Sequence, residues 1–85
     1  MKYKVEITRC ALKSLENVDK IYKKKIRDRI RSLATDPRQN GSIKLSGSKN
    51  SYRTRVGKYR IIYEIYDNQV LVEVINIDHR KDVYK

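Results

Sequence analysis

The chain has 85 residues and a formal net charge of +11, because 21 Lys and Arg outnumber 10 Asp and Glu. This length suits one small domain, residues 1–85, and the charge favours an acidic partner such as nucleic acid, an anionic membrane surface or an acidic protein. One cysteine excludes an internal disulfide and a thiolate metal cluster, and no segment resembles a signal peptide or reaches the roughly 20 apolar residues of a membrane span, so we expect a soluble cytoplasmic protein.

A strand and a short helix are predicted at the N-terminus. Residues 2–8 alternate between apolar and polar side chains, as a half-buried strand does. Thr8 is suited to cap the helix that follows, because its hydroxyl can accept hydrogen bonds from N–H groups of the first turn. We expect Cys10 to be buried rather than to be a reactive thiol. The apolar residues expected to face the core are Tyr3, Val5, Ile7, Ala11, Leu12, Leu15 and Val18.

A second helix is predicted over residues 19–34. Asp19 suits its N-cap, and Asp36-Pro37 ends it because the residue before proline avoids the helical region. Its apolar stripe consists of Tyr22, Ile26, Ile30 and Leu33. Its other faces carry Lys20, Lys23, Lys24, Lys25, Arg27, Arg29 and Arg31, with Asp28 as the one acid among them. Such a cationic surface is most often solvated, but it could also follow a nucleic-acid backbone or receive an acidic partner.

The C-terminal half is predicted to be mostly strand. A Gly- and Ser-rich loop over 38–51, with a brief strand at 43–45, precedes three strands. An Asp67-Asn68 turn joins the last two of them. These strands cover residues 51–56, 58–66 and 70–77. The order β-α-α-β-β-β predicts an α+β fold, in which a helical hairpin packs on one face of a small, mainly antiparallel sheet. The hairpin is long enough for the first strand to pair in parallel with a later one.

Positive charge is concentrated on the expected centre of the sheet. From Pro37 to Tyr63 there are seven Lys or Arg residues and no acid. Arg53 and Arg55 are two residues apart on one strand and so share a face, and Arg60 joins them if it lies opposite Arg55. Guanidinium groups offer paired donors that match phosphate oxygens. The pattern predicts either a phosphate-binding face or a solvated face whose cations serve solubility.

Three residues of the tail and one central carboxylate add candidate chemistry. Tyr84 can stack on an RNA base beside Arg80, and His79, the only histidine, can exchange a proton near neutral pH. Alternatively, His79 is solvated and Tyr84 packs on the core. Glu64 shares the face of Arg60; we expect it to pair with an arginine there, and a role as proton acceptor is the alternative. The sequence has no Gly-rich phosphate loop, no His/Cys metal-ligand spacing and no Ser-His-Asp arrangement.

Several segments and their order along the chain form a recognisable pattern. They are Ala11-Leu12-Lys13, Lys44-Leu45-Ser46-Gly47, Tyr52-Arg53-Thr54-Arg55-Val56-Gly57-Lys58-Tyr59-Arg60-Ile61-Ile62-Tyr63-Glu64-Ile65 and His79-Arg80-Lys81-Asp82-Val83-Tyr84. The combination resembles the RelE/ParE superfamily of toxins from toxin–antitoxin systems. No single segment is specific, but together they cover nearly the whole chain.

The resemblance implies a type II toxin that cleaves mRNA in the ribosomal A site without a metal or other cofactor. It implies partners as well: the ribosome, its mRNA, and an antitoxin protein that wraps the toxin and neutralises its basic surface. RelE proper has lysine where this chain has Arg53 and Arg55, and because arginine is a poor proton acceptor, His79 or Glu64 would have to be the base. The implied catalytic residues are Arg53, Arg55, Arg60, His79, Arg80 and Tyr84.

Two alternatives share the same fold. A toxin of the ParE branch would poison DNA gyrase and lack the cationic site. A degenerate homologue would only bind its antitoxin or RNA. The presence of the strand arginines together with Tyr84 favours the nuclease branch.

Overall fold

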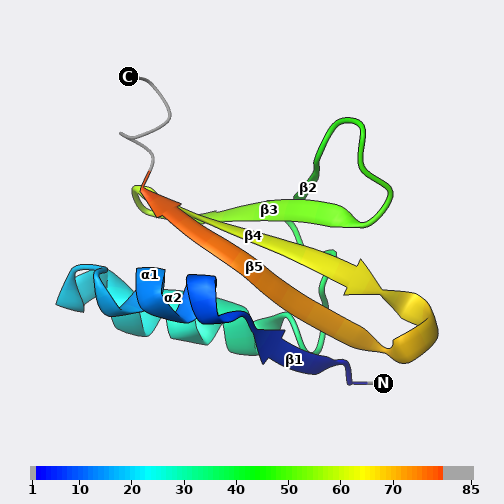
Figure 1. The fold of residues 1–85 in the computed structure, drawn as a ribbon, viewed down its shortest axis with the longest axis horizontal. Helices are drawn as coiled ribbons and strands as arrows, with labels where there is room; N and C mark the ends of the chain where they lie inside the picture. Colours follow the sequence, from blue (N-terminus) through cyan, green and yellow to red (C-terminus); the bar gives the residue numbers. More distant parts are fainter. Residues whose placement is uncertain (1, 80–85) are drawn as a thin grey trace.

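The computed structural model describes residues 2–79, and its elements follow the expected order (Figure 1). They are β1 (Lys4–Ile7), α1 (Arg9–Glu16), α2 (Lys20–Ser32), β2 (Ile43–Lys44), β3 (Ser51–Val56), β4 (Tyr59–Tyr66), the 3-10 turn η1 (Asp67–Gln69) and β5 (Leu71–His79). One sheet has the order β1-β5-β4-β3-β2, with β1 parallel to β5 and the other pairs antiparallel. The predicted α+β fold, the parallel first strand and the brief strand after the helices are confirmed.

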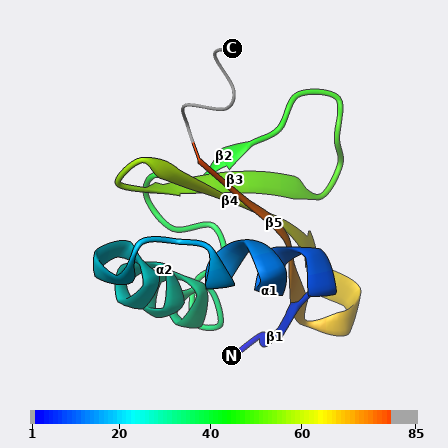
Figure 2. The same cartoon turned by 60° about the vertical axis from the view of Figure 1, so that its left-hand side comes forward.

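The two helices lie on one face of the sheet, and no helix of residues 2–79 covers the opposite face, which we call the open face (Figures 1 and 2). The hydrophobic core fills the space between these two layers. It consists of Ala11, Leu15, Val18, Ile26, Ile30 and Leu33 from the helical layer and Val56, Tyr59, Ile61, Tyr63, Ile65, Val72, Val74 and Ile77 from the sheet. Because strand side chains alternate, burial of this face directs the residues between them to the open face.

β4 is the centre of the sheet, with β3 on one side and β5 on the other. Its residues alternate between buried and partly exposed along the whole strand. The Tyr63 hydroxyl crosses the core to donate to Pro37 O, and it also lies at hydrogen-bonding distance from Ser42 Oγ, both at 2.7 Å. Burial raises the pKa of Tyr63. The loop after α2 is therefore attached to the central strand.

The helix starts differ in how they are capped. Thr8 Oγ1 accepts a hydrogen bond from Ala11 N at 3.1 Å, as predicted, and donates one to Ile75 O in β5 at 2.9 Å. Asp19 precedes α2, but its side chain makes no capping hydrogen bond. The first helix is thus tied to the sheet by its own cap.

Three residues predicted to be buried are exposed instead. Leu12 is 48% exposed, Ile7 is 37% exposed, and the Cys10 thiol is also on the surface. The short helix α1 packs on β5 through Ala11 and Leu15, and Leu12 lies about 100° further round the helix than Ala11. Ile7 belongs to β1, an edge strand, where fewer neighbours cover a side chain.

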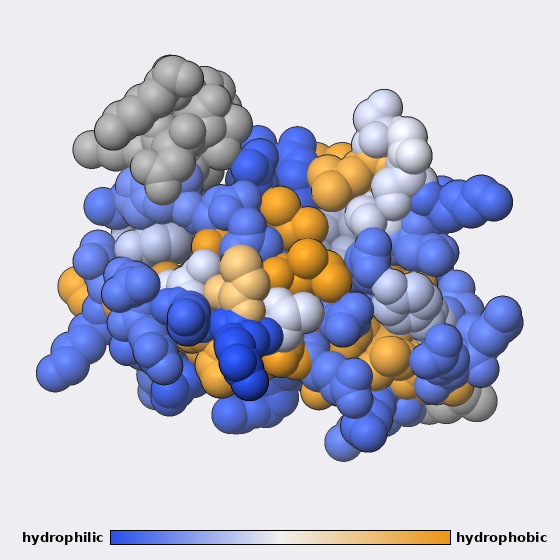
Figure 3. Space-filling model, viewed as in Figure 1, coloured by the Kyte–Doolittle hydropathy of each residue, from blue (hydrophilic) through white to orange (hydrophobic). Residues whose placement is uncertain are grey.

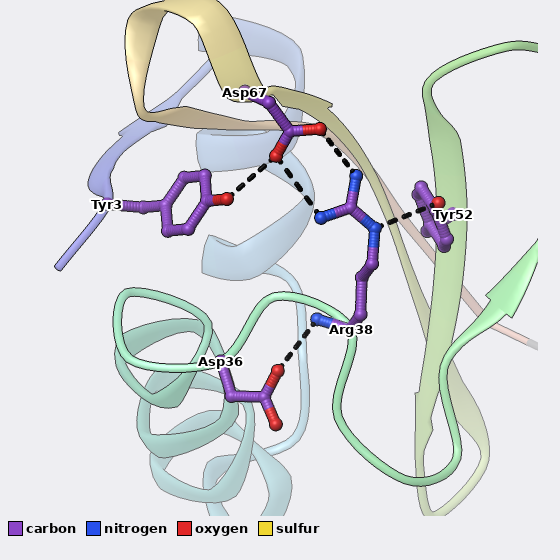
Figure 4. A network of polar contacts seen from close by, with 5 residues as sticks. All are labelled: Tyr3, Asp36, Arg38, Tyr52 and Asp67. Atoms are coloured by element: carbon purple, nitrogen blue, oxygen red, sulfur yellow. Dashed lines mark hydrogen bonds and ion pairs between the residues drawn. The ribbon is translucent and has the colours of Figure 1, made fainter. Parts of the chain in front are cut away.

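A polar network joins the N-terminal segment, the loop after α2, β3 and η1 (Figure 4). The Asp67 carboxylate accepts hydrogen bonds from Arg38 Nη2 at 2.8 Å, Arg38 Nη1 at 3.2 Å and the Tyr3 hydroxyl at 2.7 Å. Arg38 Nε donates to the Tyr52 hydroxyl at 3.2 Å. The bonds from Arg38 and then Tyr3 lower the pKa of Asp67, and the same carboxylate raises the pKa of Tyr3.

We expect this network to make stability sensitive to acid. Because the folded-state pKa of Asp67 is depressed, its contribution is complete above the unfolded-state pKa of about 4 and is lost as pH falls through the folded-state value. Asp67→Asn should therefore be less stable than the parent at pH 7, and the difference should shrink as pH falls through the lowered folded-state pKa of Asp67. Urea unfolding at several pH values measures this difference, and a constant difference across that range would contradict the prediction.

Candidate functional site

The β3–β4 hairpin brings three predicted site residues together on the open face. Arg55 lies directly opposite Arg60 in the register, as predicted, and Arg53 lies opposite Ile62. Directly opposed residues of an antiparallel pair point to the same face. Arg53, Arg55 and Arg60 thus form what we call the arginine face, on the side of the sheet away from the helices.

The turn of this hairpin depends on a glycine. Gly57 has a φ of 59°, a left-handed conformation that glycine adopts without steric cost. A Cβ atom at this position would overlap the Tyr22 ring of α2. Gly57 therefore allows the Tyr22 ring of α2 to approach the end of the hairpin closely, while the strand register sets Arg55 opposite Arg60.

Two donor atoms of the arginine face lack an acceptor. Arg53 Nη1 and Arg60 Nε are both buried, and neither forms a hydrogen bond within residues 2–79. A buried donor without a partner costs roughly 1–3 kcal/mol, so such atoms are uncommon in the absence of a ligand. Arg53 and Arg60 are diagonal neighbours on adjacent strands, at a separation of about 7–8 Å that an anionic oxygen cluster can bridge.

Asp78 is a neighbour of the site that the sequence analysis missed. It lies opposite Arg60 in the β4–β5 register, and its Oδ2 is 3.4 Å from Arg60 Nη2. Asn76 Nδ2 donates to Asp78 Oδ1 at 2.8 Å. The ion pair engages one edge of the guanidinium and leaves Nε, which has no partner among residues 2–79, for another acceptor.

Glu64 lies on the open face but does not pair with an arginine within the described residues, so the predicted ion pair is wrong. Its carboxylate accepts hydrogen bonds from the Ser51 hydroxyl at 3.1 Å and from the Tyr66 hydroxyl. The hydrogen bond to Glu64 raises the pKa of Tyr66 to about 12. The hydroxyls of Ser51, opposite Glu64 on β3, and of Tyr66, two residues further along β4, reach this carboxylate. Arg60 is directed to Asp78 instead.

The structure does not place the His79 ring on the arginine face. His79 is opposite Tyr59 in the register, and the two rings meet edge to face with centroids 5.0 Å apart. Since Tyr59 belongs to the core, the His79 side chain points to the helical side at the end of β5. Arg80 and Tyr84 lie outside the described residues.

Residues 2–79 contain no cluster of three His, Cys, Asp or Glu side chains suited to holding a metal ion. Neither helix in this part of the chain is long and apolar enough to cross a membrane. What the arginine face offers to a ligand is three guanidinium groups, two of which have a buried donor without an acceptor among residues 2–79.

Comparison with known proteins gives consistent similarities. Residues 5–84 match the family described as ParE toxin of type II toxin-antitoxin system, parDE. The candidate toxin RelE1 of Methanocaldococcus jannaschii is 34% identical over an alignment of 88 positions, which covers 100% of this chain and 98% of that protein.

Two solved structures show the same fold. One is the archaeal RelE–RelB complex of Pyrococcus horikoshii, with a TM-score of 0.82, 27% identity, and coverage of 94% of this chain and 97% of the other. The second is the toxin–antitoxin complex RelBE2 of Mycobacterium tuberculosis, with a TM-score of 0.83, 23% identity, and coverage of 94% and 100%.

Proposed function

This chain belongs to the ParE family of toxins of type II toxin–antitoxin systems and is a RelE-type toxin, and we propose that it cleaves mRNA on the ribosome. The observation that carries the proposal is the pair of buried guanidinium donors on the arginine face, Arg53 Nη1 and Arg60 Nε, which lack an acceptor within residues 2–79. A scissile phosphate would supply acceptor oxygens to both.

The reaction is an intramolecular transesterification of the RNA backbone. The 2′-oxygen attacks the adjacent phosphorus while the bond to the 5′-oxygen breaks, which yields a 2′,3′-cyclic phosphate and a 5′-hydroxyl end. The proton of the 2′-hydroxyl passes to a base, and the leaving oxygen takes up a proton. Arg60, with Arg80, stabilises the charge that develops on the phosphate oxygens, and Arg53 and Arg55 position the backbone.

The two candidate bases differ in position. Glu64 is four residues from Arg60 on β4, which separates them by about 13 Å, and its carboxylate already accepts two hydroxyl donors. His79 follows Asp78, the direct neighbour of Arg60, but its ring packs against Tyr59 on the helical side of the sheet. We propose that the base is His79 or Glu64, which the experiment below distinguishes, and that Tyr84 stacks on the target base.

The choice of base predicts a difference in pH–rate profiles. If His79 is the base, His79→Ala should lower the cleavage rate by a factor of about 10²–10⁴ and remove the acidic limb of the pH–rate profile. Glu64→Ala should keep that limb. Single-turnover cleavage of a defined mRNA on programmed ribosomes gives both profiles, and loss of the limb in the Glu64 variant would assign the proton to Glu64 instead.

The function itself is tested by translating a defined mRNA in vitro with the protein and mapping 5′ ends. We expect new 5′-hydroxyl ends at codon-positioned sites that depend on ribosomes. A gyrase supercoiling assay with the same preparation tests the ParE-type alternative. Blocked supercoiling without codon-positioned cuts would overturn the nuclease proposal, and inactivity in both assays would identify a chain that only binds its partner.

An antitoxin is the proposed protein partner. The archaeal relative of similar fold is in complex with RelB, and the charge of +11 here favours a partner with an acidic surface. Such a partner would cover the arginine face or compete with RNA for it. Co-expression with a small reading frame, if one lies next to the gene, followed by copurification, tests this assignment.

A further inference from the structure

The cationic surface of α2 forms a groove with β3, and of its lining the proposed reaction uses only Arg55. The groove has a volume of about 520 Å³. It is lined by Lys25, Asp28, Arg29 and Ser32 of α2 and by Arg55, Val56 and Gly57 of the hairpin. Figure 2 shows the tip of the β3–β4 hairpin over α2. Three of the four charged side chains in this lining are cations.

One of these cations is fixed in position by a buried residue. Arg29 Nη1 donates to Thr54 Oγ1 at 2.8 Å, and Thr54 is fully buried in β3. A guanidinium has five N–H donors, and this hydrogen bond uses one of them. The bond therefore holds the planar group against the sheet while its other donors remain available to a ligand in the groove.

The groove is continuous with the arginine face. Arg55 lines the groove and also lies opposite Arg60 on the open face of the sheet. Since β2 pairs with β3 only at Tyr52 and Arg53, the edge of β3 beyond Arg53 has no neighbouring strand among residues 2–79. An RNA strand lying on the arginine face can therefore pass around this edge to α2 and stay next to cationic side chains along the way.

The one acid of the groove is partly neutralised from outside it. Asp28 Oδ1 is 4.0 Å from Arg31 Nη1, one turn further along α2. Lys25 Nζ lies over the Tyr22 ring, 5.7 Å from its centroid, next to the hairpin turn. The charge that the groove presents to a ligand is therefore dominated by Lys25, Arg29 and Arg55.

We propose that the groove between α2 and β3 binds the phosphodiester backbone of single-stranded RNA whose neighbouring nucleotides lie on the arginine face. The inference rests on the proposed function and extends the RNA contact from one phosphate to several consecutive phosphates. A cationic groove follows a nucleic-acid backbone by releasing counterions and does so without regard to sequence. Figure 3 shows hydrophobic residues gathered among hydrophilic ones on the face that has α1 and β5 in front.

Binding measurements with RNAs of two lengths distinguish the contribution of the groove from that of the arginine face. Fluorescence anisotropy would compare a labelled RNA of about 3 nucleotides, which fits one site, with one of about 12. In the double variant Lys25→Ala, Arg29→Gln the glutamine can still bond to Thr54, so the fold is retained. We expect its Kd for the longer RNA to rise at least tenfold and the salt slope to fall by about 1.4, while binding of the short RNA is unchanged.

Two matched variants sharpen the test. Lys20→Ala, Lys24→Ala removes the same charge from the same helix outside the groove lining and should leave the Kd for the longer RNA within about twofold. Asp28→Asn should bind the longer RNA more tightly than the parent. If the two double variants lost the same affinity for the longer RNA, the proposal of an RNA-binding groove would be overturned and the proposal for the arginine face would stand. If the parent protein bound neither RNA, the proposal that the arginine face binds RNA would be overturned as well.

Discussion

Arg60→Ala should abolish toxicity and lower the rate of ribosome-dependent RNA cleavage by about two to three orders of magnitude. That loss is typical when one donor to a developing oxyanion is removed. Arg60 has the position for this task, because its Nε is buried on the open face and Asp78 holds its other edge at 3.4 Å. Growth after induction and primer extension on a translated mRNA measure the effect. Tyr84→Ala, which lies outside the described residues, should also abolish toxicity.

A nearby cation provides the control for this variant. Lys58 is exposed in the hairpin turn, two residues from Arg60, so Lys58→Ala removes the same charge from the same element. It should remain toxic. The ion pair of Arg60 with Asp78 is partly exposed, and its loss should cost at most about 1 kcal/mol of stability. An Arg60→Ala protein that is folded by circular dichroism and still toxic would show that the arginine face is not the site.

Ile61→Ala should be among the most destabilising single changes in the chain. Ile61 is fully buried at the centre of β4, between β3 and β5 and under the helices. Truncation of a buried isoleucine to alanine costs about 2–5 kcal/mol, a large share of the roughly 5–15 kcal/mol available to a domain. The unfolding midpoint should fall by about 10 °C or more. Thermal unfolding followed by circular dichroism measures this.

The adjacent residue is the matched control. Ile62 has the same side chain on the same strand but points to the open face and is only partly buried. Ile62→Ala should cost about 1 kcal/mol or less. Equal losses at the two positions would mean that β4 does not have one buried and one open face, and the assignment of Arg60 to the open face would then be wrong as well.

Periodicity was sufficient to predict most of the fold. The alternation around Ile61 and Tyr63 predicted a central strand with one buried face, and the stripe of Ile26 and Ile30 predicted the buried side of α2. It failed at Leu12, because helical spacing marks several residues as apolar but does not say how wide the buried stripe of a short helix is. The sequence also determined that the arginine face is cationic, since Arg53 and Arg55 alternate on one strand and Gly57 closes the turn that sets Arg60 opposite Arg55.

Only the tertiary structure decided which residue of β5 lies opposite Arg60. The β4–β5 register shifts by one residue at a bulge between Ile62 and Tyr63. Without that shift, Arg60 would lie opposite Ile77, whereas with it Asp78 takes this place and Ile77 joins the core. The last strand is nearly continuous in apolar residues, so its pattern does not select a register, and packing of Ile77 against the helices does. The same shift sets His79 opposite Tyr59, on the helical side of the sheet.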